Sequence, residues 1–370
     1  MKQLFEKIKI NQIELKNRFV RSATWEGLAN PDGSCNNEIS EMVIKLAKGQ
    51  VGLIISSHAF VNQAGRAHIG QLGIYDDFLI DSYRKMVKKV HAEGSKIIMQ
   101  ITHAGGRAMI ESKDGKALGP SNLEIKKYHC RKMTSTEIKQ TVRDFTDAAR
   151  RAKEAGFDGV QLHGAHGFLL NQFLSPFFNN RKDNYGNSIE NRSRIVLEIL
   201  NSIKRELGVE FTVTIKLNSD DFLEGGFTPE QMIKVSALLE KDGIDAIELS
   251  GGNSIGKYSS SRIGKINREE DEVYYLDAAK LYKKSINVPL ILVGGIRSLQ
   301  VARELVEQEL TDYIALCRPL IREPQLIKRW LSGDTRKATC IYCNQCFIPT
   351  RAGEGLYCVV EAALNIKKDD

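Results

Sequence analysis

Short apolar runs rich in β-branched residues alternate with longer charged stretches along most of the chain. Each run is nearly all apolar, which is typical of parallel strands that are buried on both faces. Eight runs have this character: residues 18–24, 51–57, 96–103, 159–165, 211–217, 246–252, 289–295 and 313–319. This alternation constrains the fold more than any other feature of the sequence.

The charged stretches between the runs carry helix start and stop signals. Thr134 and Glu137 have the spacing of a capping box, and their stretch ends at Gly156. Thr228 precedes Pro229, an order that favours the first turn of a helix. Eight strands that are each followed by a helix predict an α/β fold of the (β/α)8 TIM barrel type. A doubly wound sheet is the alternative, and it is less favoured because no GxGxxG motif follows the first run.

The length of 370 residues admits either two average domains or one large barrel. We expect residues 1–333 to form the barrel and residues 334–370 to form a short cysteine-rich extension. Four of the seven cysteines fall in that extension, at Cys340, Cys343, Cys346 and Cys358. In a cytosolic chain such a cluster is more often metal-binding or catalytic than disulfide-bonded.

The charge pattern gives no sign of a nucleic-acid or membrane partner. The chain has 53 lysines and arginines against 46 acidic residues, a formal net charge of +7. The basic residues are scattered in short clusters that fit solvated helix faces, so the charge indicates a mild preference for anionic ligands only. No stretch has the apolar length of a membrane span, and the first residues lack the apolar core of a signal peptide. We therefore expect a cytoplasmic protein.

Polar residues at the ends of the apolar runs mark a candidate site, because barrel active sites lie at the carboxyl ends of the strands. Lys216 and Gln100 stand within apolar runs, where they either form a buried network or read the polar edge of a flat heterocycle. Gly294, Gly295 and Arg318 end the last two runs and predict a phosphate cradle. Glycines that only turn the chain are the simpler explanation, but the arginine at the matching position of the next strand favours the cradle.

His163 and His166 follow the fourth run, three residues apart. They are candidates for zinc ligands, for an anion clamp, or for polar groups satisfied beneath a loop. No carboxylate nearby has an obvious ligand spacing. Two adjacent imidazoles that donate hydrogen bonds suit a carbonyl or phenolate oxygen better than a metal.

Several stretches together resemble the Old Yellow Enzyme family of NADH:flavin oxidoreductases. The resemblance covers nearly all of residues 1–333, in order, and its most specific part begins at the histidine pair. The matching stretches are NRFVRSAT, MQITHAGGRA, HGAHGFLLNQFLSPFFNNRKDNYGNSIENR, KLNSDDFLEGG, and VGGIRS followed by CRPLIREP.

The resemblance implies a barrel that holds FMN, is reduced by NADH or NADPH, and reduces an activated C=C bond of an enone or enoate. It implies that His163 and His166 bind the oxygen that activates the alkene, and that Gln100 and Lys216 contact the isoalloxazine edge. Ser22, Ala23, Thr24, Ser57 and His58 would lie near the flavin at the ends of the first two strands. The phosphate would be held by Gly294, Gly295, Cys317 and Arg318.

Phe168 departs from the family pattern. The well-studied relatives have a tyrosine at this position, which protonates the carbon next to the carbonyl. Phenylalanine has no proton to donate, so water or another residue must supply it, or the reaction is not a simple alkene reduction.

The tail resembles the [4Fe–4S] segment of a larger branch that contains 2,4-dienoyl-CoA reductase, 2-enoate reductase and trimethylamine dehydrogenase. The Cys-x2-Cys-x2-Cys spacing of Cys340, Cys343 and Cys346, with Cys358 beyond, carries that resemblance. Zinc fits four thiolates equally well by ligand count, and a tail without metal is a third possibility. We expect this chain to lack the second flavin domain of that branch.

Three functions from different classes follow. The first is reduction of an activated alkene, with a small-molecule substrate and NAD(P)H or a redox partner as electron source. The second is oxidation of an amine, with electrons leaving through an iron–sulfur cluster to an electron-transfer partner. The third is a non-catalytic electron carrier, which the histidine pair argues against. A homo-oligomer is compatible with all three.

Overall fold

The computed structural model describes residues 2–109, 115–262, 266 and 268–369. Residues outside these ranges occur in both predicted segments, the barrel and the tail. Eight parallel strands form the central sheet, one for each apolar run. They are β3 (Phe19–Arg21), β4 (Leu53–Ile55), β6 (Lys96–Thr102), β10 (Gly159–Gly164), β11 (Thr212–Asn218), β12 (Ala246–Ser250), β13 (Leu290–Val293) and β14 (Tyr313–Leu316).

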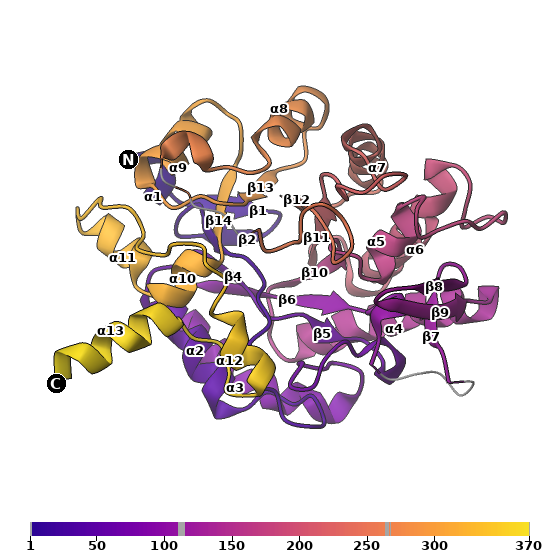
Figure 1. The fold of residues 1–370 in the computed structure, drawn as a ribbon, viewed down its shortest axis with the longest axis horizontal. Coiled ribbons are helices and arrows are strands. Elements are labelled where there is room, and N and C mark those ends of the chain that lie inside the picture. Colours follow the sequence, from indigo (N-terminus) through magenta and orange to yellow (C-terminus); the bar gives the residue numbers. More distant parts are fainter. Residues whose placement is uncertain (1, 110–114, 263–265, 267, 370) are drawn as a thin grey trace.

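The sheet closes on itself. β10 pairs with β6 on one side and with β11 on the other, and β14 pairs with β3. Every neighbouring pair is parallel, so the eight strands form a barrel with helices on its outside (Figure 1). The predicted (β/α)8 fold is therefore confirmed, and the doubly wound alternative is excluded because an open sheet has two unpaired edges.

Helices follow the strands and cover the barrel. The helix predicted after Thr134 has the expected capping box, and the helix after Thr228 begins at Pro229. The outer helices are α2 (Asn37–Lys48), α3 (Ile80–Ala92), α4 (Ser135–Glu154), α6 (Ile189–Leu207), α7 (Pro229–Lys241), α8 (Leu276–Ser285), α9 (Leu299–Glu307) and α11 (Leu326–Leu331). Within the described residues, no helix combines the length and the apolar character that crossing a membrane requires.

Several strands are shorter than the apolar runs that predicted them. β13 ends at Val293 because Gly294 and Gly295 have φ values of 126° and 81°, which a strand cannot accommodate. β12 likewise ends before Gly252, whose φ is 80°. The residues beyond these ends leave the hydrogen-bonded ladder and form the rim of the barrel.

A small β-hairpin lies at the end of the barrel that is away from the carboxyl ends of its strands. β1 (Ile8–Ile10) and β2 (Ile13–Leu15) pair antiparallel, and their buried side chains pack with apolar residues of β3, β4 and β14. The Tyr313 hydroxyl donates a hydrogen bond of 2.8 Å to the Lys9 carbonyl. The hairpin thus packs against the barrel interior from the end away from the carboxyl ends of the strands.

Further short elements lie outside the barrel strands and the outer helices. β7 (Ala117–Gly119), β8 (Leu123–Ile125) and β9 (Tyr128–Lys132) form a separate three-stranded sheet after β6. The remaining elements are α1 (Lys2–Phe5), β5 (Ala59–Phe60), α5 (Leu169–Leu174), α10 (Arg318–Arg322), and the 3-10 helices η1 (Gln63–Gly65), η2 (Asp77–Leu79), η3 (Gly105–Arg107) and η4 (Glu269–Asp271).

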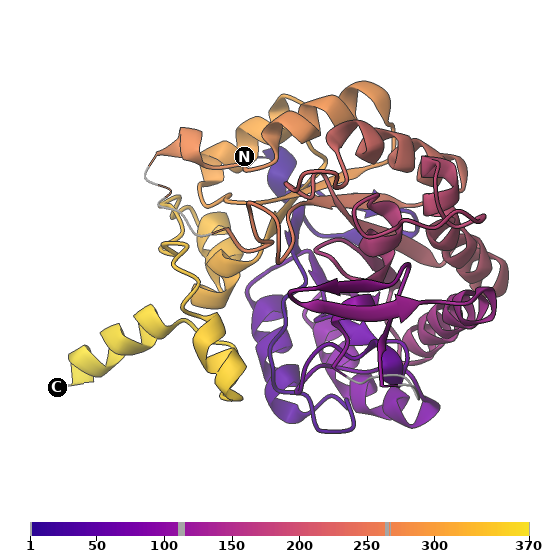
Figure 2. The ribbon, with the colours of Figure 1, turned by 45° about the vertical axis from the view of Figure 1, so that its right-hand side comes forward.

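The tail crosses the rim of the barrel before leaving it. The Ala338 amide donates to the Arg297 carbonyl, and the Tyr342 hydroxyl donates to the Ile296 carbonyl. The helix α12 (Phe347–Ala352) then packs near the first strand loop, where a Cβ on Gly27 would lie 2.8 Å from Thr350. The last helix, α13 (Val359–Asp369), extends away from the barrel (Figure 2). The division at residue 333 remains a prediction.

Candidate active site

A cavity of about 610 Å³ lies at the carboxyl ends of the barrel strands. It is where the fold brings together twelve of the thirteen residues predicted for cofactor binding or catalysis. Ser57 is the exception, since it is buried but does not line the cavity. The residues that do line it are Ser22, Ala23, Thr24, His58, Gln100, His163, His166, Lys216, Gly294, Gly295, Cys317 and Arg318.

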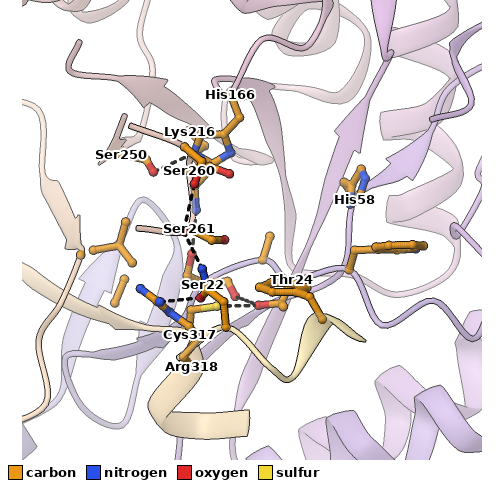
Figure 3. A pocket seen from close by; sticks show the side chains of 18 of the residues that line it. Ser22, Thr24, His58, His166, Lys216, Ser250, Ser260, Ser261, Cys317 and Arg318 are labelled. Atoms are coloured by element: carbon orange, nitrogen blue, oxygen red, sulfur yellow. Dashed lines mark hydrogen bonds between the residues drawn. The ribbon is translucent and has the colours of Figure 1, made fainter. Parts of the chain in front are cut away.

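Lys216 belongs to a buried polar network at the floor of this cavity. Its Nζ donates a hydrogen bond of 2.6 Å to Ser22 Oγ (Figure 3). It also donates one of 2.7 Å to Glu248 Oε1. Ser22 Oγ also donates to Glu248 Oε1, at 2.7 Å. Gln100 donates to Gln161, which donates to Glu248 Oε2 at 3.0 Å. Lys216 and Gln100 therefore lie both in a structural network and on the cavity wall. Their contact with the edge of a flat heterocycle stays a prediction.

Glu248 is the member of this network that the sequence analysis missed. It is fully buried in β12, directly across from Lys216 in the parallel register. A carboxylate in an apolar strand is costly unless it is paired. Lys216 was singled out because it is a charged residue within an apolar run. Glu248 stands in the apolar run AIELSGG in the same way, so the sequence also contained the evidence for this residue.

His163 and His166 stand side by side where β10 ends. Their ring centroids are 5.3 Å apart and their planes are nearly perpendicular. His166 adopts a left-handed φ of 62°, and its Nε2 lies 2.7 Å from Ser250 Oγ (Figure 3). His163 Nδ1 is buried without a partner among the described residues. Both residues line the same cavity, His163 from the end of β10 and His166 from the turn that follows it.

Burial favours the neutral form of both histidines. Burial, followed by the proximity of His166, lowers the pKa of His163 well below its usual value. Burial, followed by the positive charge of Lys216, does the same to the pKa of His166. A neutral imidazole has one N–H donor and one acceptor nitrogen. The pair can therefore donate hydrogen bonds to an oxygen in the cavity without adding net charge to it.

Phe168 lies against His163, one member of the histidine pair, and against His58. Its ring centroid is 4.5 Å from that of His163 and 5.4 Å from that of His58. The guanidinium carbon of Arg107 lies 5.1 Å from the Phe168 ring centroid, and Arg107 Nη1 donates to the His166 carbonyl at 2.9 Å. The position that the resemblance assigns to a proton donor thus holds an apolar ring beside a cation.

The glycine pair at the end of β13 lies beside two tyrosine rings. A Cβ on Gly294 would lie 2.9 Å from the Tyr275 ring, and one on Gly295 would lie 2.8 Å from the Tyr274 ring. Side chains at these positions would clash, so the backbone there requires glycine. Arg318, on α10, lines the same end of the cavity and donates to Asn344 Oδ1 at 2.6 Å.

A second arginine stands near Arg318. The Arg262 guanidinium carbon lies 4.3 to 5.1 Å from the ring centroids of four aromatic side chains, and its Nε and Nη2 are buried without partners among the described residues. Tyr274 Oη is also buried without a partner. Neither arginine has a carboxylate partner within the described part of the chain. Arg318, the Tyr274 hydroxyl and the glycine turn line the cavity and fit a phosphate group, whereas Arg262 lies behind them among the aromatic rings and does not line it.

The four tail cysteines line one small cavity of about 20 Å³, which also contains Arg318 and Arg322. Thiolates in such a cavity would be offset by the two arginines, and four thiols suit a soft metal or an iron–sulfur cluster. In the ranges that the structure describes, no three His, Cys, Asp or Glu side chains are arranged to hold one metal ion. Four thiols are suitable ligands for a metal centre, but in the described residues they are not arranged around a single metal ion.

Comparison with known proteins places this geometry in a family. The profile of the NADH:flavin oxidoreductase / NADH oxidase family matches residues 3–336. The chain therefore belongs to that family of oxidoreductases, as its resemblance to the Old Yellow Enzyme family predicted.

Individual relatives with a known name or structure are also similar to this chain. Cinnamate reductase of Clostridium sporogenes is 31% identical over 93% of this chain. A structure of a 2-naphthoyl-CoA reductase with 2-naphthoyl-CoA is 29% identical over 97% of this chain, with a TM-score of 0.89. An Old Yellow Enzyme homologue from Zymomonas mobilis is 25% identical over 91% of this chain, and the chain covers 94% of it, with a TM-score of 0.77. The chain spans only 55% and 56% of the first two proteins.

The buried pair of Lys216 and Glu248 gives a testable consequence for stability. Lys216→Met or Glu248→Gln alone leaves one buried charge unpaired, and each should lower the free energy of unfolding of the apoprotein by about 3–5 kcal/mol. The double variant should lose less than the sum of the two, because it leaves no unpaired charge. Urea denaturation followed by circular dichroism measures these differences.

Lys7→Met provides the control for that experiment. Lys7 and Glu14 form an ion pair with side chains that are 73% and 50% exposed. Losing an exposed pair should change stability by about 0–1 kcal/mol. Strictly additive losses in the Lys216 and Glu248 variants would contradict the coupling.

Proposed function

We propose that the large cavity binds FMN and that the protein reduces an electron-poor C=C bond with electrons from NAD(P)H. The observation that carries this proposal is the neutral histidine pair, which faces a cavity whose opposite end fits a phosphate. Membership of the flavin oxidoreductase family and the name of the cinnamate reductase relative support it.

The residues that would hold FMN divide into two groups. Gln100, Lys216 and Ser22 would meet the polar edge of the flavin ring at the cavity floor, with Ala23, Thr24, Ser57 and His58 nearby. The phosphate would be held by Gly294, Gly295, Cys317 and Arg318, and we add Tyr274, which also lines the cavity, to this group. FMN, when bound, supplies the hydride chemistry that no side chain of the protein provides.

His163 and His166 would then polarise the substrate. Each neutral imidazole would donate a hydrogen bond to the oxygen that activates the alkene, which is the atom on which negative charge develops when such an alkene is reduced. Donors that are fixed in place before the reaction stabilise such charge at little cost in reorganisation. The left-handed turn at His166 and its contact with Ser250 hold one donor in that position.

The charge of the cavity argues against amine oxidation. Among the described residues that line it there is no aspartate or glutamate, whereas Arg107, Lys127, Lys216, Arg318 and Arg351 all line it. A protonated amine would meet five cationic side chains and no carboxylate from the described part of the chain. Alkenes that carry a carbonyl or a carboxylate suit this cavity better.

Two half-reactions test the proposed function. We expect NADH or NADPH to bleach the flavin absorbance of the anaerobic holoenzyme, and an enone or enoate to restore it. Stopped-flow absorbance measures both steps. Reduction of the flavin by amines, with no reoxidation by unsaturated carbonyl compounds, would reverse the assignment.

Phe168→Tyr should restore the missing proton donor. We expect the variant to reoxidise faster with simple enones, because one general acid is typically worth about 10²–10⁴-fold in rate. Phe168→Leu is the matched control, since it changes the side chain without adding a hydroxyl. Unchanged or slower reoxidation in Phe168→Tyr, with FMN still bound, would show that protonation does not limit the reaction.

We also propose that Cys340, Cys343, Cys346 and Cys358 bind a [4Fe–4S] cluster, with zinc as the alternative metal. Their shared cavity supports this proposal. Anaerobically reconstituted protein should contain about four irons per chain with acid-labile sulfide. Cys343→Ser should lose that iron, whereas Cys35→Ser, at a cysteine beside α2, should keep it. Stoichiometric zinc without iron would identify a structural zinc site instead.

A further inference from the structure

The turn that carries His166 has two left-handed residues, and side chains bind the backbone of both. His166 and Gly167 have φ values of 62° and 75°. The His166 carbonyl accepts a hydrogen bond of 2.9 Å from Arg107, and the Gly167 carbonyl accepts one of 2.8 Å from the Gln172 side chain. A residue other than glycine rarely adopts a left-handed φ, and it stays there only where the surrounding structure holds it. The contacts of this turn therefore help to place the His166 ring.

Two asparagines bind the amides of the same turn. The His166 amide donates to Asn218 Oδ1 at 3.1 Å, and the Gly167 amide donates to Asn171 Oδ1 at 2.7 Å. Both asparagines are fully buried, one at the end of β11 and the other in α5. An asparagine side chain carries an acceptor oxygen and a donor NH2 group, so a further contact must determine which of the two faces the turn.

Asp221 provides that contact for both asparagines with one oxygen atom. Its Oδ1 accepts from Asn218 Nδ2 at 2.7 Å and from Asn171 Nδ2 at 3.1 Å. Its Oδ2 accepts from the Phe227 amide at 3.0 Å. All three partners are N–H groups, so the carboxyl group acts only as an acceptor, which is the role of its ionised form. Each asparagine must then present its NH2 group to Asp221 and its oxygen to the turn.

The burial of Asp221 makes this arrangement specific. The residue has no exposed surface, and the part of the chain that the structure describes contains no salt bridge to it. A carboxylate in such a place is costly unless hydrogen bonds replace those of water. None of the three side chains of Asp221, Asn171 and Asn218 lines the large cavity. They therefore act on a ligand through the turn rather than by contact.

We infer that Asp221 is a positioning residue for His166. Through Asn171 and Asn218 it holds the left-handed turn in the conformation that places the His166 ring beside that of His163. The inference rests on the proposed function, in which these two rings bind one substrate oxygen. It adds a residue outside the cavity to the part of the protein that would polarise the substrate.

Binding of 4-nitrophenol to the FMN-loaded protein tests the inference, because a phenolate oxygen accepts hydrogen bonds from imidazoles. Asp221→Asn keeps the size of the side chain but replaces one acceptor oxygen by an NH2 group. The Kd of 4-nitrophenol should rise about 10- to 100-fold, which is the effect of losing one hydrogen bond to a charged group. The Kd of FMN should stay the same. Isothermal titration calorimetry measures the first constant, and quenching of flavin fluorescence measures the second.

His166→Ala supplies a readout that a general structural role would not change. If Asp221 acts through His166, Asp221→Asn should weaken 4-nitrophenol binding no further once the imidazole is absent. The double variant should then match His166→Ala alone. Equal losses in the two backgrounds would overturn the inference, because Asp221 would then support the cavity as a whole.

Asp220→Asn is the matched control at the neighbouring position. The Asp220 carboxylate accepts from the Phe222 amide, and neither Asn171 nor Asn218 bonds to it among the described residues. Its replacement keeps an acceptor oxygen for that amide, so the affinity for 4-nitrophenol should not change. A loss as large as that of Asp221→Asn would contradict the inference.

The exchange of Asn218→Asp with Asp221→Asn keeps the test decisive if Asp221→Asn alone does not fold. The exchange retains one buried charge, an acceptor for the His166 amide and an NH2 group between the two positions. It should bind 4-nitrophenol more tightly than His166→Ala does, and binding no tighter than that would overturn the inference.

The same measurements separate the inference from the proposed function. If binding of 4-nitrophenol follows these expectations but enones fail to reoxidise the reduced flavin, the positioning role stands and the proposed reaction fails. If His166→Ala leaves the affinity for 4-nitrophenol unchanged, the oxygen site at the histidines fails, and the positioning role fails with it.

Discussion

Closure of the eight-stranded sheet is the constraint on which the rest of the structure depends. β10 joins β6 to β11, so no strand edge is left within the barrel. The interior is then too narrow for a ligand, and the β1–β2 hairpin packs against its apolar end. Polar side chains that point into the barrel therefore do one of two things. They bond to one another, as in the network around Glu248, or they line the cavity at the carboxyl ends of the strands.

The sequence predicted the parts of the site that depend on strand ends. Parallel strands of a barrel bring their carboxyl ends to one rim, so a residue's place in an apolar run was enough to put Gln100, His163 and Lys216 in one cavity. Glu248 also lies in an apolar run, and it was missed only because that run was not searched for a buried charged residue. The predicted strands were too long where glycines with positive φ end the ladder, since periodicity alone does not record φ.

Residues that reach the cavity from loops could not be predicted in this way. Tyr274 lies between β12 and β13, and Asn344 and Arg351 lie in the tail. Their positions depend on how irregular segments cross the rim, for which hydrophobic pattern gives no information. The tail was expected to be a separate metal-binding extension. It also forms part of the wall of the large cavity, through residues between Tyr342 and Arg351.

Arg318 lines both cavities, and its bond to Asn344 ties the end of β14 to the cysteine loop. If the two proposed groups, FMN and a metal at the cysteines, both bind, a side chain that lines both cavities would couple their affinities. A ligand at the cysteines that moves Asn344 would then change the affinity of the neighbouring cavity for an anion, and an anion bound there would change the affinity of the cysteines by the same factor. The free energy of the doubly loaded protein is the same whichever group enters first, so kinetics would set the order of their incorporation.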